Sequence, residues 1–429
     1  MPDLTSALLP ALQANRIPEL DLGGDFIYPA YAGQSALNLP ASICHWLGVP
    51  QLGNAPLISD ILDNFEGPFK RVVVILADAL ALHRLQRWMS DGSAPVWEGL
   101  AEKGILAPLT SLAPSTTSTV LPTLWSGASP AEHGMVGYEL WLREYSVVSN
   151  MILHSPITYY GDVGSLSRAK FDPETFLHVP MLGTHLKEHG VSTHVYQPST
   201  ILGSGLSKIL FKDTHVHGYL EPADLWLNVR QLFESRPDEH MYTWVYWPLI
   251  DTYSHKYGPD TEYPQASFAN FSATFEREFL NALKDELRED TLLLLTADHG
   301  QITTHDNPHY DLSNHDNLAR RLHMNPTGEN RMMYLYIQPG QVDAVQEYIE
   351  RSWPNQFSVV DSQYALHKGL FGPGEPDERV AQRLGELTVT ARGDAYLWWM
   401  WQKANPLIGR HGGLTAEEML VPLLGARLA

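Results

Sequence analysis

The sequence is short of cysteine, of long apolar runs and of positive charge. Cys44 is the only cysteine among 429 residues, so no intramolecular disulfide can form and no oxidising compartment is needed. We interpret Cys44 as a small core residue rather than a nucleophile. No stretch approaches the ~18 uninterrupted apolar residues of a membrane span. The first residues also lack the basic segment and apolar run of a signal peptide. We therefore expect a cytoplasmic protein that does not associate with a membrane.

Positive charge is scarce relative to negative charge. Lys and Arg number 29 against 49 Asp and Glu, which gives a net charge of −20. This balance argues against extended nucleic acid as a partner. A small phosphate ester stays possible, because bound cations would reverse the local sign of the charge. No pattern in the sequence indicates an oligomeric state.

Buried strands alternate with helical segments along the chain, without an internal repeat. This order predicts an α/β fold, a three-layer α/β/α sandwich around a mostly parallel sheet, with a small cap insertion. The expected strands are 71–78, 104–109, 191–196, 241–251, 291–297, 332–337 and 420–424, with a hairpin at 138–160. The expected helices are 80–90, 119–125, 180–189, 221–235, 262–288, 341–351 and 415–419.

Changes in composition predict three regions. Residues 1–70 are rich in Pro, Gly and aromatic residues and are expected to form an N-terminal arm packed on the core. The α/β core is expected over 71–311 and 401–429, with a cap or insert over 312–400. The aromatic stretch Tyr396–Trp401 is either core or a lid over a ligand, and core is favoured. The histidine-rich segment 305–323 is interpreted as a solvated loop rather than as a further metal site.

Three apolar strands are followed by an acidic residue. They are expected to end at Asp78, Asp251 and Asp298, and the carboxyl ends of neighbouring parallel strands meet at one edge of a sheet. Close carboxylates repel one another and lose hydration, at a cost of several kcal/mol for each unpaired ion. Divalent cations relieve this cost, so the sequence predicts a metal site at this edge.

Three histidines could complete this site. His255 follows Asp251 by four residues, which places the two side chains together if the segment is a helical turn. His299 comes directly after Asp298 and is followed by Gly300, while His411 stands between glycines. Mixed sets of Asp and His ligands favour zinc, with manganese or iron as alternatives.

A run of hydroxyl residues, Pro114-Ser-Thr-Thr117, precedes the helix expected at 119–125. Small hydroxyl residues cap helices well. The same position offers free backbone N–H groups to an anion. Either interpretation fits this loop taken alone.

Together these motifs resemble the type I phosphodiesterase/nucleotide pyrophosphatase branch of the alkaline phosphatase superfamily. The matching pieces occur in the family's order over roughly residues 70–425. They are Asp78 after its strand, Pro114-Ser-Thr-Thr117, Ser126-Gly127, Pro130-Ala-Glu-His-Gly134, Asp251-Thr-Tyr-Ser-His255, Ala297-Asp298-His299-Gly300 and His411-Gly-Gly.

The resemblance implies a role for each residue. Asp251, His255 and His411 would hold one zinc ion, and Asp78, Asp298 and His299 the other. Thr117 would be the nucleophile and would also contact the metal, with Thr116 as the nearest competitor.

The expected activity is that of a metal-dependent phosphodiesterase or nucleotide pyrophosphatase, a hydrolase acting on a small phosphate ester. Thr117 would form a phospho-threonine intermediate that water then hydrolyses. Phosphomonoester or phosphonate hydrolysis and a phosphoglycerate mutase are alternatives on the same scaffold. A mutase of this kind would carry a Ser nucleophile, so Thr117 speaks against it. A non-catalytic metal-binding protein is an alternative of a different class.

Overall fold

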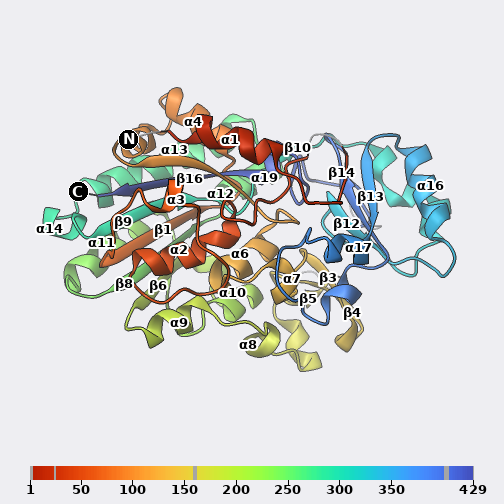
Figure 1. Cartoon of the computed structure of the whole chain (residues 1–429), viewed down its shortest axis with the longest axis horizontal. Coiled ribbons are helices and arrows are strands. Elements are labelled where there is room, and N and C mark those ends of the chain that lie inside the picture. The colour runs from red at the N-terminus through yellow and green to blue at the C-terminus, as the bar shows by residue number, and fades with distance from the viewer. Residues whose placement is uncertain (1–2, 24–25, 158–161, 401–404, 429) are drawn as a thin grey trace.

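The computed structural model describes residues 3–23, 26–157, 162–400 and 405–428. The last residues of the expected hairpin, 158–160, lie outside the described part. The same holds for Trp401, the last residue of the expected aromatic stretch. Figure 1 shows a large α/β layer structure with a second, smaller sheet to its right. Among the described residues no helix is both long and apolar enough to cross a membrane.

A central seven-stranded sheet organises the larger part of the molecule. Its strands, in spatial order, are β2 (Ile105–Thr110), β16 (Leu420–Arg427), β9 (Thr291–Thr296), β1 (Arg71–Ala77), β8 (Met241–Trp247), β6 (Ser192–Pro198) and β7 (His215–Tyr219). β16 runs antiparallel to both of its neighbours, and β1, β8, β9, β6 and β7 are mutually parallel. Every residue of β1 and β9 is buried. Helices on both faces explain their continuous apolar sequences.

Two groups of helices cover this sheet, one on each face (Figure 1). One group packs around α13 and contains α4 (Leu82–Ser90), α5 (Pro95–Lys103), α11 (Pro222–Ser235), α12 (Leu249–Tyr257) and α13 (Glu262–Phe275). The other packs around α6 and contains α2 (Leu39–Trp46), α6 (Thr117–Ser126), α9 (Leu182–Glu188) and α10 (Gly205–Leu210). The predicted α/β/α sandwich with a mostly parallel sheet is therefore confirmed.

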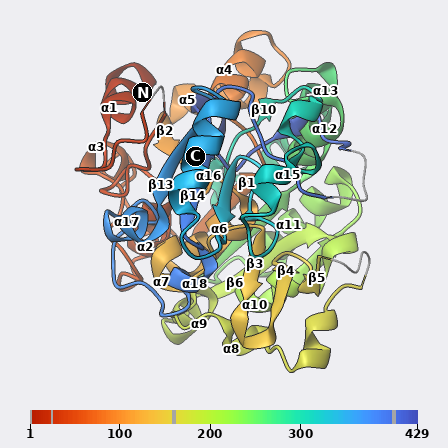
Figure 2. The same cartoon turned by 90° about the vertical axis from the view of Figure 1, so that its right-hand side faces the viewer.

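The second sheet forms a cap, which faces the viewer in Figure 2. Its order is β13 (Phe357–Asp361), β14 (Leu387–Ala391), β12 (Met332–Leu335), β11 (Thr327–Gly328), β3 (Glu139–Leu142), β4 (Val147–Asn150) and β5 (Ser155–Pro156). Helices α15 (Asp316–Ala319), α16 (Val342–Ser352), α17 (Ser362–His367) and α18 (Val380–Arg383) accompany it. The sheet thus joins the hairpin placed by sequence in the core to the expected 312–400 insert, through the pairing of β11 with β3.

The N-terminal residues pack on the core. Leu37, Cys44 and Trp46 are fully buried, and α2 lies against α6. Burial raises the pKa of Cys44 to about 11, so its thiol stays neutral and structural. The remaining short elements are α1 (Thr5–Ala14), η1 (Ala36–Asn38), α3 (Ser59–Leu62), α7 (Pro130–His133), η2 (Arg143–Tyr145), η3 (Ser165–Ala169), α8 (Pro173–Phe176), η4 (Ser199–Ile201), η6 (Pro308–Tyr310) and η7 (Leu312–Asn314).

Two secondary-structure predictions were wrong. The strand expected over 241–251 ends at Trp247, because Pro248 cannot donate a ladder hydrogen bond and precedes α12 instead. The helix expected over 262–288 ends its α-helical part at Phe275. It continues as a π-helical turn, η5 (Glu276–Leu280), and resumes only as α14 (Asp285–Arg288).

A buried ion pair ties the cap to the core. The Arg331 guanidinium, at the start of β12, donates to both carboxylate oxygens of Glu418 at 2.7 and 2.8 Å, and both side chains are fully buried. Glu418 belongs to α19 (Ala416–Met419) and also accepts from Gly413 N and Thr415 Oγ1. The pair therefore fixes the turn that carries His411.

Replacing Arg331 by Leu is expected to lower the free energy of unfolding by about 3 kcal/mol, because it leaves Glu418 charged and buried. Denaturant unfolding measures this loss. Arg320→Leu, at an exposed position directly after α15, is the matched control and should change little. A loss of less than about 1 kcal/mol for Arg331→Leu would contradict a structural role for the pair.

Candidate active site

The acidic residues meet at the carboxyl edge of the central sheet. β1 lies between β8 and β9, so Asp78, directly after β1, adjoins Asp298, two residues after β9. Asp78 is held by its backbone N–H, which donates to Trp247 O at 2.9 Å. Asp251 reaches the same edge from the first turn of α12. The three carboxylates are therefore brought together, although only two of them directly follow a strand.

The histidines converge on the same place. Asp251 and His255 lie one turn apart on α12, with Asp251 Oδ1 3.2 Å from His255 Nε2. The short strand β10 (Ile302–Thr303) pairs with β15 (Gly409–Arg410), which sets His411 beside His299. The rings of His299 and His411 stack with centroids 3.8 Å apart. Gly300 allows the chain at Glu417 to lie directly against it, because a Cβ there would collide with the carbonyl oxygen of Glu417.

Two overlapping groups of ligand atoms result among the described residues. Atoms of Asp78, Asp298 and His299 lie within 4.8 Å of one another, as do atoms of Asp251, His299 and His411. His255 joins the second group through Asp251. His299 stands between the two groups, whereas the sequence-based assignment gave it to one ion alone.

The donor set fits divalent cations. Asp78 Oδ1 and Asp298 Oδ2 are buried and accept no hydrogen bond in the described structure. The other oxygen of Asp78 accepts from Tyr246 Oη, and that of Asp298 accepts from the N–H of His299 at 3.1 Å. Each carboxylate thus keeps one oxygen free, and a metal ion is the partner that two close, buried carboxylate oxygens need.

The hydrogen bonds of the imidazoles also suit metal ligation. Nδ1 of His255, His299 and His411 lies 2.8, 3.0 and 3.1 Å from the carbonyl oxygens of Gly409, Gly300 and Ser115, respectively. A carbonyl oxygen only accepts, so each Nδ1 carries a proton, and in the neutral form of each ring Nε2 offers its lone pair to a cation. Hydrogen bonds from Nδ1 to a backbone carbonyl orient the rings of metal-binding histidines.

Electrostatics in the site reflect the crowding of negative charge. Burial, followed by the carboxylates of Asp298 and Asp251, raises the pKa of Asp78 well above its usual range. Burial also favours the neutral form of Asp251, but His255 and the other imidazoles outweigh it and lower the pKa of Asp251. Divalent cations would relieve the repulsion around Asp78.

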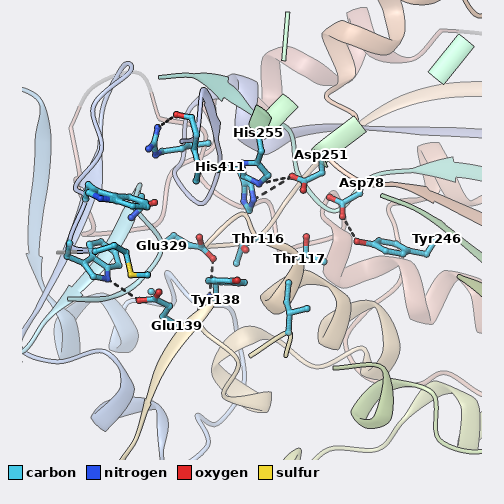
Figure 3. A pocket seen from close by; sticks show the side chains of 18 residues that line it. Asp78, Thr116, Thr117, Tyr138, Glu139, Tyr246, Asp251, His255, Glu329 and His411 are labelled. Carbon is cyan, nitrogen blue, oxygen red and sulfur yellow. Dashed lines mark hydrogen bonds and ion pairs between the residues drawn. The ribbon is translucent and has the colours of Figure 1, made fainter. Parts of the chain in front are cut away.

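Thr117 is the first residue of α6 and faces the ligand groups. Its Oγ1 lies 3.1 Å from His299 Nε2, and the side chain is nearly buried. Thr116 is the N-cap residue, and its side chain hydrogen-bonds to Glu329 on the cap side. Figure 3 shows Thr117 below Asp251 and Asp78, with Thr116 beside Glu329. The side chains of Thr116 and Thr117 thus point in different directions, Thr116 toward Glu329 and Thr117 toward His299. Their positions in the sequence did not reveal this difference.

A cavity of about 410 Å³ lies between the ligand groups and the cap. Core residues Asp78, Thr117, Asp251, His255 and His411 line one side. Cap residues Tyr138, Glu139, Glu329, Trp398, Trp399 and Met400 line the other (Figure 3).

Sequence reasoning missed several residues of this site. Gln301 donates from Nε2 to Asp251, and Tyr246 donates to Asp78. Gln301 directly follows Asp298-His299-Gly300 and could have been found from that position. Glu139 and Glu329 carry no local signal, because they reach the cavity only through the pairing of β3 with β11.

The structure also describes the two segments for which the sequence left alternatives, the aromatic stretch that begins at Tyr396 and the histidine-rich segment 305–323. Tyr396 to Trp399 are buried, as the core interpretation required, but Trp398 and Trp399 also line the cavity. In the histidine-rich segment, His309 and His315 bond to backbone carbonyls and to Tyr348. Within the described residues, no histidine of 305–323 belongs to a group suited to a metal ion.

The comparisons with known proteins agree with this geometry. A family model described as "Type I phosphodiesterase / nucleotide pyrophosphatase" matches residues 72–414. No curated protein matches the chain significantly by sequence.

Similar solved structures include a murine ectonucleotide pyrophosphatase/phosphodiesterase 5, in an inactive threonine-to-alanine variant with AMP. It is 15% identical over 83% of this chain and 87% of that one, with a TM-score of 0.60. Phosphonoacetate hydrolase from Sinorhizobium meliloti 1021, with phosphonoacetate, is 16% identical over 83% and 89%, with a TM-score of 0.59. These likenesses establish the fold.

Proposed function

The chain belongs to the type I phosphodiesterase/nucleotide pyrophosphatase family, a family of phosphoester hydrolases, and from this premise we propose a zinc-dependent phosphodiesterase with Thr117 as nucleophile. Its substrate is a small phosphate diester. The observation that carries the proposal is the position of Thr117 Oγ1, 3.1 Å from the His299 Nε2 that joins the two ligand groups.

The proposal assigns two divalent cations to the two ligand groups. Asp251, His255 and His411 would hold one, and Asp78, Asp298 and His299 would hold the other. Zinc is the preferred ion for such mixed nitrogen and oxygen donors, with manganese or iron as substitutes. Bound there, these ions would lower the pKa of the attacking oxygen and offset charge on the phosphoryl group.

The residues of the chain carry the rest of the mechanism. Thr117 Oγ1 loses its proton and attacks phosphorus in line with the departing oxygen, the ester bond breaks, the departing oxygen leaves as an alcohol after it takes up a proton, and phospho-threonine forms. Water then attacks phosphorus from the opposite side, and Thr117 Oγ1 leaves and takes up a proton as the phosphomonoester is released. In the first turn of α6 the N–H of Thr119 already donates to Thr116 O at 3.0 Å. The N–H groups of Thr117 and Ser118 come before the first intrahelical hydrogen bonds, so they can bind a phosphoryl oxygen in both steps.

Charge favours a diester over a monoester. Glu139 and Glu329 face the ligand groups across the cavity. Above their raised pKa values of about 7 and about 8, these carboxylates repel the second charge of a phosphomonoester. They also disfavour a phosphonate that bears a carboxylate, such as the ligand of the similar hydrolase.

The chain's free, buried Cys44 suits a reducing compartment, and the proposal places the enzyme in the cytoplasm.

A substrate panel tests this proposal. The zinc-loaded protein is expected to hydrolyse bis-p-nitrophenyl phosphate with a kcat/KM at least ~10-fold above that for p-nitrophenyl phosphate, which corresponds to ~1.4 kcal/mol of discrimination. Phosphonoacetate should be a poorer substrate than either ester. Hydrolysis of the monoester or the phosphonate in preference to the diester would overturn the proposal.

A further inference from the structure

Two carboxylates meet on the cap side of the cavity because of one strand pairing. Glu139 begins β3 and pairs with Gly328 at the end of β11, so Glu329 follows directly beside it. The two backbones approach closely, since a Cβ on Gly137 would lie only 2.8 Å from Cα of Gly328. Both side chains line the cavity. The fold therefore places two acidic groups from distant parts of the chain against the same ligand space.

Each carboxyl group is held in place but makes no ion pair with a described residue. The indole Nε1 of Trp399 donates to Glu139 Oε2 at 3.0 Å. The backbone N–H of Tyr138 donates to Glu329 Oε1 at 3.0 Å. Within the described part of the chain neither carboxylate takes part in an ion pair (Figure 3).

Arg410 does not supply the missing charge. It lines the cavity, but its guanidinium donates to the Thr304 hydroxyl, to Asn405 Oδ1 and to the carbonyl of Leu407. It also stacks over the ring of Tyr396, at 3.9 Å from the centroid. The hydrogen bonds and the ring contact of Arg410 are thus made with neighbours other than Glu139 and Glu329.

Leaving two acidic groups together in this place costs stability. Like charges on neighbouring strands repel one another, and buried charges without a partner are costly. Burial accordingly raises the pKa of Glu139 to about 7 and that of Glu329 to about 8, the latter also through Glu139. A cation arriving with the substrate would stabilise both carboxylates.

Aromatic residues complete this side of the cavity. Tyr138, Trp398 and Trp399 line it beside the two acids. Aromatic rings attract cations through their quadrupole, and an alkylated ammonium group satisfies rings and carboxylates at once. We call Tyr138, Glu139, Glu329, Trp398 and Trp399 the acidic wall.

We propose that the acidic wall binds an ammonium group on one organic arm of the phosphodiester, so that the substrate is a zwitterion with an anionic phosphoryl group and a cationic amine. This inference rests on the proposed diesterase function. The phosphoryl group lies at Thr117 and the ammonium group lies across the cavity, between the two carboxylates.

Two isosteric diesters test the proposal. The p-nitrophenyl diester of phosphorylcholine carries a quaternary ammonium group, and its 3,3-dimethylbutyl analogue has a neutral carbon in place of the nitrogen. Consumption of each diester is followed by chromatography, so that cleavage of either ester bond is counted. The zinc-loaded wild-type enzyme is expected to favour the cationic diester at least ~10-fold in kcat/KM.

Variants locate the origin of this preference. In Glu139→Gln/Glu329→Gln the ratio of the two kcat/KM values is expected to fall to about one. The ratio is taken within each protein, so a reduced active fraction cancels. Glu350→Gln, the same change at an exposed position of α16, is the control and should keep the wild-type ratio.

The outcomes separate this inference from the proposed function. A wild-type ratio near one, with both diesters hydrolysed, overturns the ammonium site and leaves the diesterase standing. A high ratio that persists in the double variant overturns the role of the two glutamates. Failure to hydrolyse these diesters and bis-p-nitrophenyl phosphate alike overturns the diesterase itself, and the ammonium site with it.

Discussion

Replacing Thr117 by Ala is expected to lower kcat for a phosphodiester by at least ~10⁴-fold, because it removes the attacking oxygen. The structure gives the hydroxyl no evident structural task that would complicate this result. Oγ1 lies beside His299 Nε2 and at the edge of the cavity, and the loss of one methyl-sized contact leaves α6 intact. Steady-state hydrolysis of bis-p-nitrophenyl phosphate measures the effect.

Three further variants make this test specific. Thr117→Ser keeps a hydroxyl at the same position and is expected to retain a substantial part of the activity. Thr116→Ala removes the competing hydroxyl, whose partner is Glu329, and should cost far less than Thr117→Ala. Thr175→Ala, at an exposed position, is the control for the chemical change itself. Equal losses for Thr116→Ala and Thr117→Ala, or a larger loss for Thr116→Ala, would contradict the assignment.

Removal of divalent cations is expected to lower kcat/KM by a similar factor, at least ~10⁴-fold. Asp78 and Asp298 each present a buried oxygen without a hydrogen bond, and three histidines present Nε2 lone pairs. A site built in this way depends on cations for both phosphoryl binding and activation of the attacking oxygen. Activity is measured after dialysis against a chelator, and again after addition of zinc, manganese or iron(II).

Zinc is expected to restore the activity best, at about two equivalents per chain. Addition of magnesium is the negative control, because Mg²⁺ prefers an octahedral shell of oxygen ligands. Full activity in a protein shown by elemental analysis to be free of metal would contradict the proposed mechanism.

The central sheet could be predicted from sequence because its signals are local. The continuous apolar runs of β1 and β9 are long enough to identify strands buried on both faces, and helices separate them in the chain. The convergence of Asp78 and Asp298 follows from this topology alone, because neighbouring parallel strands end at one edge. Asp251 was expected at the end of a strand, but Pro248 ends β8 and moves it onto α12.

The cap could not be predicted in the same way. The pairing of β3 with β11 joins residues almost two hundred positions apart, and nothing near Glu139 indicates Glu329 as its neighbour. The same holds for the orientation of the two threonines, which depends on how α6 starts. Sequence therefore indicated residues that gather into two groups suited to a metal ion, but not which residues face them across the cavity.

The most direct test of the central claim is anomalous scattering at the zinc absorption edge, from crystals of the zinc-loaded protein. Two peaks about 4 Å apart are predicted. One is expected among Asp251, His255 and His411, and the other among Asp78, Asp298 and His299 on the side of Thr117. Peaks at other positions, with none at these two, would contradict the account.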